Sequence, residues 1–405
     1  MLLLFLFLYS LHTVSSTQKK EIEELLDVAQ TIEYFGYPVE KHYVTTDDGY
    51  TSEVQRIPYG RDARTINGCN EKRPVVFFMH GLFASAHEFV MNLPSQSPAF
   101  VFADAGFDVW LGNVRGTEYG LNHTTLSPDD AKFWNFTYYE YSHFDLRQQI
   151  DYALEVTQHK SLFYVGHSQG TAVMFARLAE ADCTWQSKIR IFFALGPTAG
   201  FLKPLLPFSL LEDDLVQTLI QLVLDGRFGI IPISIPKSLS SFLADFCTSE
   251  VLSHVCAGVF ELSDGMERLA QLNTSRVSIF LSHFPSTTST LNLLHWVQVF
   301  KYHELRRLDL GARRNLIAYG QTEAPRLDIG RITAQTVLYF SHDDRITDEV
   351  DVKDVLIKNM GPGLIEYYDL DHFSHFDFAI GLRANDEVYK PIIYRIYQEI
   401  AEKRC

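Results

Sequence analysis

The chain has 405 residues, of which 46% are hydrophobic, 21% charged and 13% aromatic. This composition is typical of globular proteins and excludes a largely disordered or fibrous chain. The formal net charge is −15 at pH 7. Such an acidic chain argues against nucleic acid as a partner, because neutralising phosphates requires an excess of lysine and arginine. Net charge alone would not hold it on anionic membranes either.

The N-terminal segment Met1–Leu11 is apolar, and no charged side chain occurs before Lys19. Its apolar core is roughly half as long as a membrane-spanning helix. Small residues follow at Ser15 and Ser16, so we expect a signal peptide that is cleaved near Ser16. The alternative is a buried N-terminal helix or an uncleaved anchor. No later stretch reaches about 18 uninterrupted apolar residues, so we expect no transmembrane segment.

A signal peptide would direct the chain to the secretory pathway, and two other features fit that route. N-glycosylation sequons begin at Asn122, Asn135 and Asn273. Three sequons after a signal peptide indicate lumenal residence, either in the lysosome or outside the cell. The chain also has five cysteines, and this environment permits disulfides. Cys247 and Cys256 could close a short loop, with a stabilisation of roughly 2–3 kcal/mol. Spacing does not assign Cys69, Cys183 or Cys405.

Helices and short apolar strands are expected to alternate along the mature chain. Apolar residues from Ile22 to Ile32 recur at helical spacing, and this helix is expected to end at Gly36–Pro38. The predicted strands, rich in β-branched and aromatic residues, are 75–79, 107–111, 162–165, 189–195, 336–340 and 364–370. Continuous apolar strands separated by helices indicate an α/β fold with a parallel sheet covered on both faces.

This alternation stops between about Ala199 and Asp328. The stretch looks helical and irregular, and its position between two strand-bearing blocks predicts an inserted cap. Its apolar runs, such as 201–211 and 230–235, either pack on the core or line an apolar groove. We therefore expect a signal peptide at 1–16, a first part of the core at 17–198, the cap at 199–328 and a second part of the core at 329–405.

The sequence Gly166-His-Ser-Gln-Gly170 follows one predicted strand directly and precedes a predicted helix over 171–179. This is a G-x-S-x-G motif in the strand–turn–helix context that presents a nucleophilic serine. The turn is so tight that glycine is expected at both Gly166 and Gly170. The following helix directs its N-terminal N–H groups at the site, which favours an oxyanion. We expect Ser168 to be the nucleophile, and the alternative is a structural serine in a glycine turn.

A serine hydroxyl needs a base, and in this motif's fold an acid and then a histidine follow the serine along the chain. Asp343 and Asp344 follow the predicted strand 336–340, while His372 and His375 follow the predicted strand 364–370. Both loops leave the carboxyl ends of strands, where active sites of open α/β sheets lie. Chemistry alone does not separate the two aspartates or the two histidines.

The oxyanion donors are expected from the backbone. His80-Gly81-Leu82 follows the predicted strand 75–79, where this fold places its second donor. We assign the N–H groups of Leu82 and of Gln169, the residue after the nucleophile. No metal or organic cofactor is implied.

Taken together, these motifs resemble the acid lipase family, which includes gastric and lysosomal lipases. The resemblance runs from about Ile32 to Val388. It is carried by the segments 35–38, 48–50, 56–60, 80–82, 92–94, 103–106, 108–113, 115–116, 133–134, 166–170, 273–276, 281–283, 295–296 and 375–378. It implies an α/β-hydrolase core with a helical lid, a triad of Ser168, Asp344 and His375, and a cap disulfide between Cys247 and Cys256.

The resemblance further implies hydrolysis of fatty-acyl esters of neutral lipids, triacylglycerols or cholesteryl esters, at a lipid–water interface. Activity in acid would require a base whose pKa lies below the ordinary histidine value of about 6.5. Two alternatives keep the fold. One is an inactive lipid-binding or lipid-transfer protein, and the other is an acyltransferase. The oligomeric state is left open.

Overall fold

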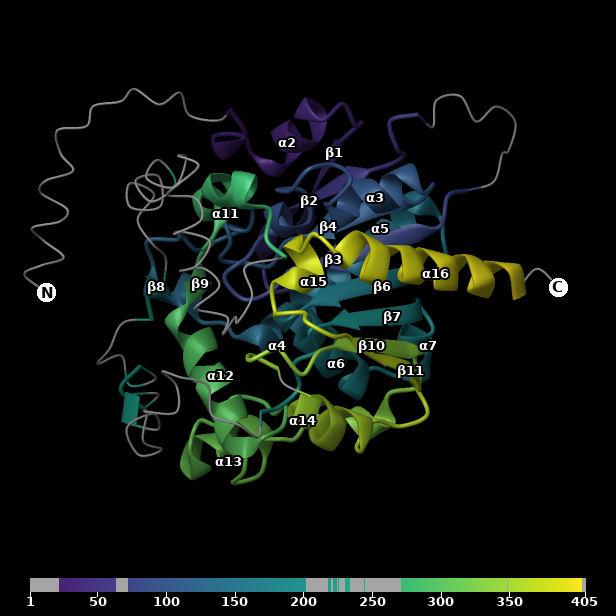
Figure 1. Ribbon diagram of the computed structural model, residues 1–405. Coiled ribbons are helices and arrows are strands. Elements are labelled where there is room, and N and C mark those ends of the chain that lie inside the picture. The colour runs from purple at the N-terminus through teal and green to yellow at the C-terminus, as the bar shows by residue number, and fades with distance from the viewer. Residues whose placement is uncertain are drawn as a thin grey trace, which may run out of the picture.

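The computed structural model describes residues 22–62, 72–201, 271–347 and 349–402, with a few residues between 218 and 244. A nine-stranded sheet forms the centre of the molecule (Figure 1). Its strands are β1 (Glu40–Thr45), β2 (Tyr50–Ile57), β3 (Val75–Met79), β4 (Asp108–Gly112), β5 (Asn122–His123), β6 (Leu162–His167), β7 (Ile189–Leu195), β10 (Thr336–Phe340) and β11 (Leu364–Asp369). All six predicted strands are confirmed, with bounds that differ by at most two residues.

The strand order is β1-β2-β4-β3-β6-β7-β10-β11, and β5 pairs with β2. All pairs from β4 to β11 are parallel, whereas β1, β2 and β4 are joined antiparallel. The prediction of a mostly parallel α/β sheet is therefore confirmed. The β1–β2 hairpin was not predicted, because its strands mix polar and apolar residues and lack a continuous apolar run.

Two apolar layers cover the sheet, one on each face. Successive residues of each strand point alternately into one layer and the other. Phe77, Tyr164 and Phe192 point into the layer with α5 (Arg147–Thr157) and α6 (Gln169–Glu180). Phe78 and Phe193 point into the layer with α2 (Val28–Tyr34), α3 (Pro98–Asp104) and α16 (Lys390–Glu402). Short helices α4 (Tyr138–Glu140), α7 (Cys183–Gln186), α14 (Glu349–Asp351) and α15 (Asp377–Ile380) complete these layers.

Two sequence expectations need correction. The predicted N-terminal helix is split into a 3₁₀ turn, Ile22–Glu24, and α2, because Asp27 caps α2: its carboxylate accepts from the Gln30 N–H, and its own N–H donates to the Gln30 side chain. The strand β11 is an edge strand with mostly exposed side chains. Coverage of the sheet on both faces therefore fails at this edge.

Between β7 and β10 the chain leaves the sheet and returns to the neighbouring position. The described part of this insertion includes the helices α11 (Val277–His283), α12 (Thr290–Tyr302) and α13 (Ala312–Tyr319), which lie along one side of the sheet (Figure 1). A two-stranded ribbon joins β8 (Pro232–Ile233) to β9 (Thr288–Ser289). The apolar run 202–211 lies outside the described residues. Among the described helices, none has the length and apolar character needed to cross a membrane.

Candidate active site

Ser168 sits in a sharp turn between β6 and α6. Its φ of +51° and ψ of −122° are costly for a residue with a side chain. A Cβ atom at Gly166 would lie 2.9 Å from the backbone of Gly170, and one at Gly170 would lie 2.2 Å from the carbonyl oxygen of Met79. Glycine is therefore required at both positions to let the turn pack against β3 and present the hydroxyl.

The turn is held by hydrogen bonds to its own backbone. The Ser168 N–H donates to the Leu195 carbonyl at 3.0 Å, and the Thr171 hydroxyl donates to the Ser168 carbonyl at 2.6 Å. Helix α6 begins at Gln169. The positive end of that helix therefore adjoins the serine, where it would favour a developing negative charge.

His375 and Asp344 meet beside this turn. Nδ1 of His375 lies 2.8 Å from Oδ2 of Asp344, and both residues are buried. The remaining acceptor sites of the carboxylate are also used. Its Oδ1 accepts from the N–H groups of Ile346 and Thr347, and its Oδ2 accepts from the Thr347 hydroxyl at 2.9 Å. Asp344 is thus fixed as an acceptor that orients the imidazole.

The neighbouring acid and histidine form a different pair. Nδ1 of His372 lies 3.0 Å from Oδ2 of Asp343, and both side chains are about half exposed. The structure therefore separates two pairs that chemistry alone left equivalent. Asp343 and His372 pair on the surface, whereas Asp344 and His375 pair in the interior.

A cavity of about 170 Å³ brings the predicted site residues together. Ser168, His375, Leu82 and Gln169 all line it. Most of the remaining wall is apolar and aromatic, formed by Phe83, Phe201, Phe284, Trp296, Phe300, Ile346 and Phe376, and the rest is formed by Gly81, Glu88, His167 and Thr198. Because Phe284, Trp296 and Phe300 belong to the insertion, the core and the insertion enclose the cavity jointly.

The loop that carries Leu82 runs close to the serine. A Cβ atom at Gly81 would lie 3.2 Å from Cβ of Ser168. The Gly81 N–H donates to Glu88 Oε2 at 2.9 Å, and the Phe83 carbonyl accepts from the Ser286 N–H at 2.6 Å. This loop, the candidate oxyanion loop, is thus tied both to the core and to the insertion.

Comparisons with known proteins identify the family. Residues 28–93 match the model of a partial alpha/beta-hydrolase lipase region, and residues 74–379 match that of the alpha/beta hydrolase fold. Lipase lipl-3 of Caenorhabditis elegans is 38% identical, with 96% of each chain covered. Human gastric triacylglycerol lipase is 35% identical over 93% of this chain and 92% of its own. The chain belongs to the lipases of the α/β-hydrolase fold.

The resemblance seen in the sequence is therefore confirmed, and the protein is a carboxylic ester hydrolase that acts on lipid esters. A solved lipase candidate from Sulfolobus solfataricus shares the fold at a TM-score of 0.56 and 13% identity, with 89% of this chain and 99% of that chain covered. At this level of identity the similarity concerns the fold only.

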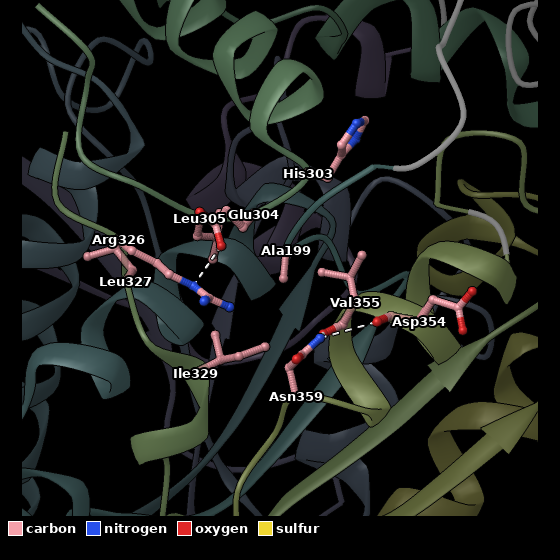
Figure 2. Close-up of a pocket in the computed structure, with 10 residues that line it drawn as sticks. All are labelled: Ala199, His303, Glu304, Leu305, Arg326, Leu327, Ile329, Asp354, Val355 and Asn359. Carbon is pink, nitrogen blue, oxygen red and sulfur yellow. Dashed lines mark hydrogen bonds and ion pairs between the residues drawn. The ribbon is translucent and has the colours of Figure 1, made fainter. Parts of the chain in front are cut away.

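A second cavity of the lipase, about 210 Å³, lies on the other side of the segment 198–201. Thr198 and Phe201 line the serine's cavity, whereas Ala199 lines this one. Figure 2 shows its polar rim, where Arg326 and Glu304 form an ion pair and the Asn359 amide donates to backbone carbonyls of the adjacent helix. It contains none of the predicted site residues.

The expected modification sites differ in exposure. Asn122 and Asn135 are exposed. Asn273 is half-buried, caps the turn 274–276 through Ser275, and donates from Nδ2 to Gln96 Oε1 at 2.9 Å.

Cys183 is a free, exposed thiol. Cys247, Cys256, Cys69 and Cys405 lie outside the described residues. In the described part of the lipase, no group of three or more His, Cys, Asp or Glu side chains could hold a metal ion.

Several side chains around the site had no signal in the sequence. The Gln169 side chain accepts hydrogen bonds from Asn292 and Trp296 of α12. Gly196, at φ +53°, leaves room for the imidazole, since a Cβ there would lie 3.1 Å from its Cε1. His167 is the second residue of the G-x-S-x-G motif, but the motif allows any residue there and so predicted no role for it.

Proposed function

We propose that the lipase hydrolyses fatty-acyl esters of neutral lipids through a triad of Ser168, His375 and Asp344. The observation that carries this proposal is the pairing of His375 with the buried Asp344, at 2.8 Å, beside a serine that opens into the same apolar cavity. A solvent-exposed histidine on a loop would have no buried carboxylate as partner and would not line an apolar cavity.

In the proposed reaction the Ser168 hydroxyl attacks the acyl carbonyl while Nε2 of His375 takes its proton. Asp344 holds the Nδ1–H tautomer and stabilises the imidazolium that forms. The N–H groups of Leu82 and Gln169 stabilise the oxyanion, a contribution of roughly 10²–10³ in rate for each donor of this type. His375 then protonates the departing alcohol, and water releases the fatty acid from the acyl-enzyme by the reverse steps.

The cavity wall supports the substrate class. Most of the wall is aromatic or aliphatic, as at Phe201, Trp296 and Phe300, and its charged side chains, Glu88 and His167, are paired with each other. An apolar wall favours an uncharged acyl chain, whose burial gains about 25 cal/mol per Å² of apolar surface. Triacylglycerols and cholesteryl esters both present such chains, so both remain within the proposal.

We further propose that residues 199–328 form a cap that opens at a lipid–water interface. Four of the aromatic side chains of the cavity wall come from this insertion, so access to Ser168 depends on its position. The signal peptide at 1–16, glycans at the exposed Asn122 and Asn135 and at Asn273, and a Cys247–Cys256 disulfide belong to the same proposal of a secreted or lysosomal lipase.

The test is covalent labelling with a fluorophosphonate, followed by hydrolysis of triolein and cholesteryl oleate between about pH 4 and 8. We expect label on Ser168 and release of free fatty acid, and neither in Ser168→Ala. Hydrolysis by Ser168→Ala at the wild-type rate would contradict the triad. A protein that binds lipid without labelling would be a binding or transfer protein. Acyl transfer to an added alcohol in place of fatty-acid release would indicate an acyltransferase.

A further inference from the structure

A buried acid and a buried histidine lie directly behind the proposed triad. His167 ends β6 immediately before Ser168, and Glu88 lies in the 3₁₀ helix Ala86–Phe89 that follows the oxyanion loop. Their side chains are only 1% and 5% exposed. Neither residue has a step in the proposed reaction, and burial of two ionisable groups is costly unless each is paired.

The two side chains connect the two halves of the proposed site. Nδ1 of His167 lies 2.5 Å from Glu88 Oε1, and Nε2 of His167 lies 2.9 Å from the backbone carbonyl oxygen of His375. Glu88 Oε2 accepts from the Gly81 N–H at 2.9 Å. One continuous chain of hydrogen bonds therefore runs from the backbone of the proposed base to the oxyanion loop.

This arrangement fixes the number of protons on the pair. A backbone carbonyl can only accept, and an ionised carboxylate can only accept. With Glu88 ionised, His167 satisfies both partners only when both of its ring nitrogens carry a proton, that is, as an imidazolium. Burial raises the pKa of Glu88, but the charge and hydrogen bond of His167 outweigh this and hold that pKa below its ordinary value. The carboxylate is therefore the charged partner of the imidazolium.

His80 shows the contrast within the same region. Its Nδ1 donates to the Gly81 carbonyl at 2.9 Å, while its Nε2 accepts from the Val114 N–H at 3.3 Å. One acceptor and one donor require a neutral ring, and burial lowers the pKa of His80 accordingly. The different partners of the two histidines, and not burial alone, set their different protonation.

We propose that Glu88 and His167 are positioning residues of this lipase. The proton shared by this pair keeps the base, His375, and the oxyanion loop in a fixed position relative to each other. Removing the proton as the pH rises takes away one donor, so the hydrogen bond to the His375 carbonyl and the ion pair with Glu88 cannot both persist. The pair therefore sets the alkaline limit of activity. This inference rests on the proposed triad.

The pair lies close to the proposed base and to other titratable groups. The ring centroids of His167 and His375 are 5.0 Å apart. Of the surrounding titratable groups, His80, His375 and Tyr389 lie against the pair, while Glu118 acts on His80 and Asp377 acts on Tyr389. Burial raises the pKa of Tyr389 well above its ordinary value, so that phenol stays neutral throughout.

The variant Glu88→Gln tests the role of the charge. Glutamine keeps an acceptor for Gly81 but removes the carboxylate that stabilises the imidazolium. On a short soluble ester, we expect the alkaline limb of kcat/KM to move down by about one pH unit or more and kcat to fall about tenfold, with little change in KM. Glu399→Gln is the matched control. Glu399 of α16 is buried beside Arg190 of β7 and does not line the cavity. Its pH profile should superimpose on that of the wild type.

A second measurement does not depend on the variant folding or on turnover. In the wild-type protein with ¹⁵N-labelled histidine, the ring signals of His167, identified by their loss in His167→Gln, should show two protonated nitrogens at about pH 5 to 6. A ring with one unprotonated nitrogen there would overturn the proposal, as would a Glu88→Gln profile identical to that of the wild type. Failure of Ser168 to react with fluorophosphonate would instead contradict the proposed function, while the NMR result would stand.

Discussion

The indole N–H of Trp296 donates to the side-chain Oε1 of Gln169 at 2.7 Å, and this bond joins the insertion to the residue after the proposed nucleophile. Asn292 donates to the same oxygen at 2.9 Å. All three side chains are buried, so the bonds are shielded from water. Helix α12 therefore fixes Gln169, whose backbone N–H is a proposed oxyanion donor, in addition to lining the cavity.

Trp296→Phe should weaken this link while keeping an aromatic side chain. We expect kcat on a short soluble ester to fall about threefold to tenfold with little change in KM, because one buried hydrogen bond contributes about 1 kcal/mol. Trp185→Phe is the matched control, since the Trp185 indole nitrogen is buried without a hydrogen-bond partner in the described structure and lies away from the cavity. Equal kcat values in wild type and Trp296→Phe would show that α12 does not position the donor.

Asp344→Asn should remove most of the activity. The amide can keep the shape of the side chain but cannot stabilise an imidazolium, and it can favour the wrong tautomer of His375, so kcat should fall by roughly 10³–10⁴. Asp343→Asn changes the neighbouring exposed residue in the same way, and its kcat should stay close to that of the wild type. Steady-state kinetics on one ester distinguish the two. A larger loss in Asp343→Asn would reverse the assignment.

Gly196→Ala should displace the base. The new Cβ would lie 3.1 Å from the imidazole of His375, and the backbone is at φ +53°. Gly320→Ala introduces comparable backbone strain at φ +74°, with nothing within 4 Å of the new atom. Both variants should lose about 1–2 kcal/mol of stability in urea unfolding, but only Gly196→Ala should lose kcat, by about tenfold or more. Similar kcat values in the two variants would mean that the imidazole tolerates the displacement.

The serine and its surroundings were predictable because the G-x-S-x-G motif combines local chemistry with a local turn. The strand before Gly166 and the helix after Gly170 can both be identified from short-range patterns. The choice between Asp343 and Asp344 was different. Both follow the same strand, and only the packing of the loop decides which carboxylate is buried against His375.

Contacts that depend on distant parts of the chain left no trace in the sequence. Glu88 pairs with a residue 79 positions away, and Gln169 meets Trp296 across 127 positions. The β1–β2 hairpin was missed for a similar reason: its half-exposed strands acquire their pairing from the sheet edge. The side chains of β11 are exposed because this strand is the last in the sheet. Its place in the strand order could not be predicted from the apolar runs.

Glu118 should make stability depend on pH in the acid range. Its carboxylate accepts from the hydroxyls of Ser85, at 2.9 Å, and of Ser286, at 2.5 Å, and His87 lies 3.8 Å away. Burial raises the pKa of Glu118, but the interaction with His87 and the hydrogen bond from Ser286 outweigh it and lower the pKa to about 2. Because Ser286 belongs to the insertion, this carboxylate links the insertion to the core.

A lowered carboxylate pKa stabilises the folded state above the unfolded value of about 4.3, and this stabilisation is lost as the pH falls through about 2. Glu118→Gln should therefore be less stable than the wild type at about pH 6, by roughly 1–2 kcal/mol once partial exposure of the carboxylate is allowed for. The difference should persist near pH 4.5 and shrink towards pH 2 in urea unfolding. Glu349→Gln, at an exposed ion pair with Lys353, should cost less than about 0.5 kcal/mol. A Glu118→Gln deficit that is the same at pH 6 and pH 2 would show that ionisation of Glu118 does not hold the insertion to the core.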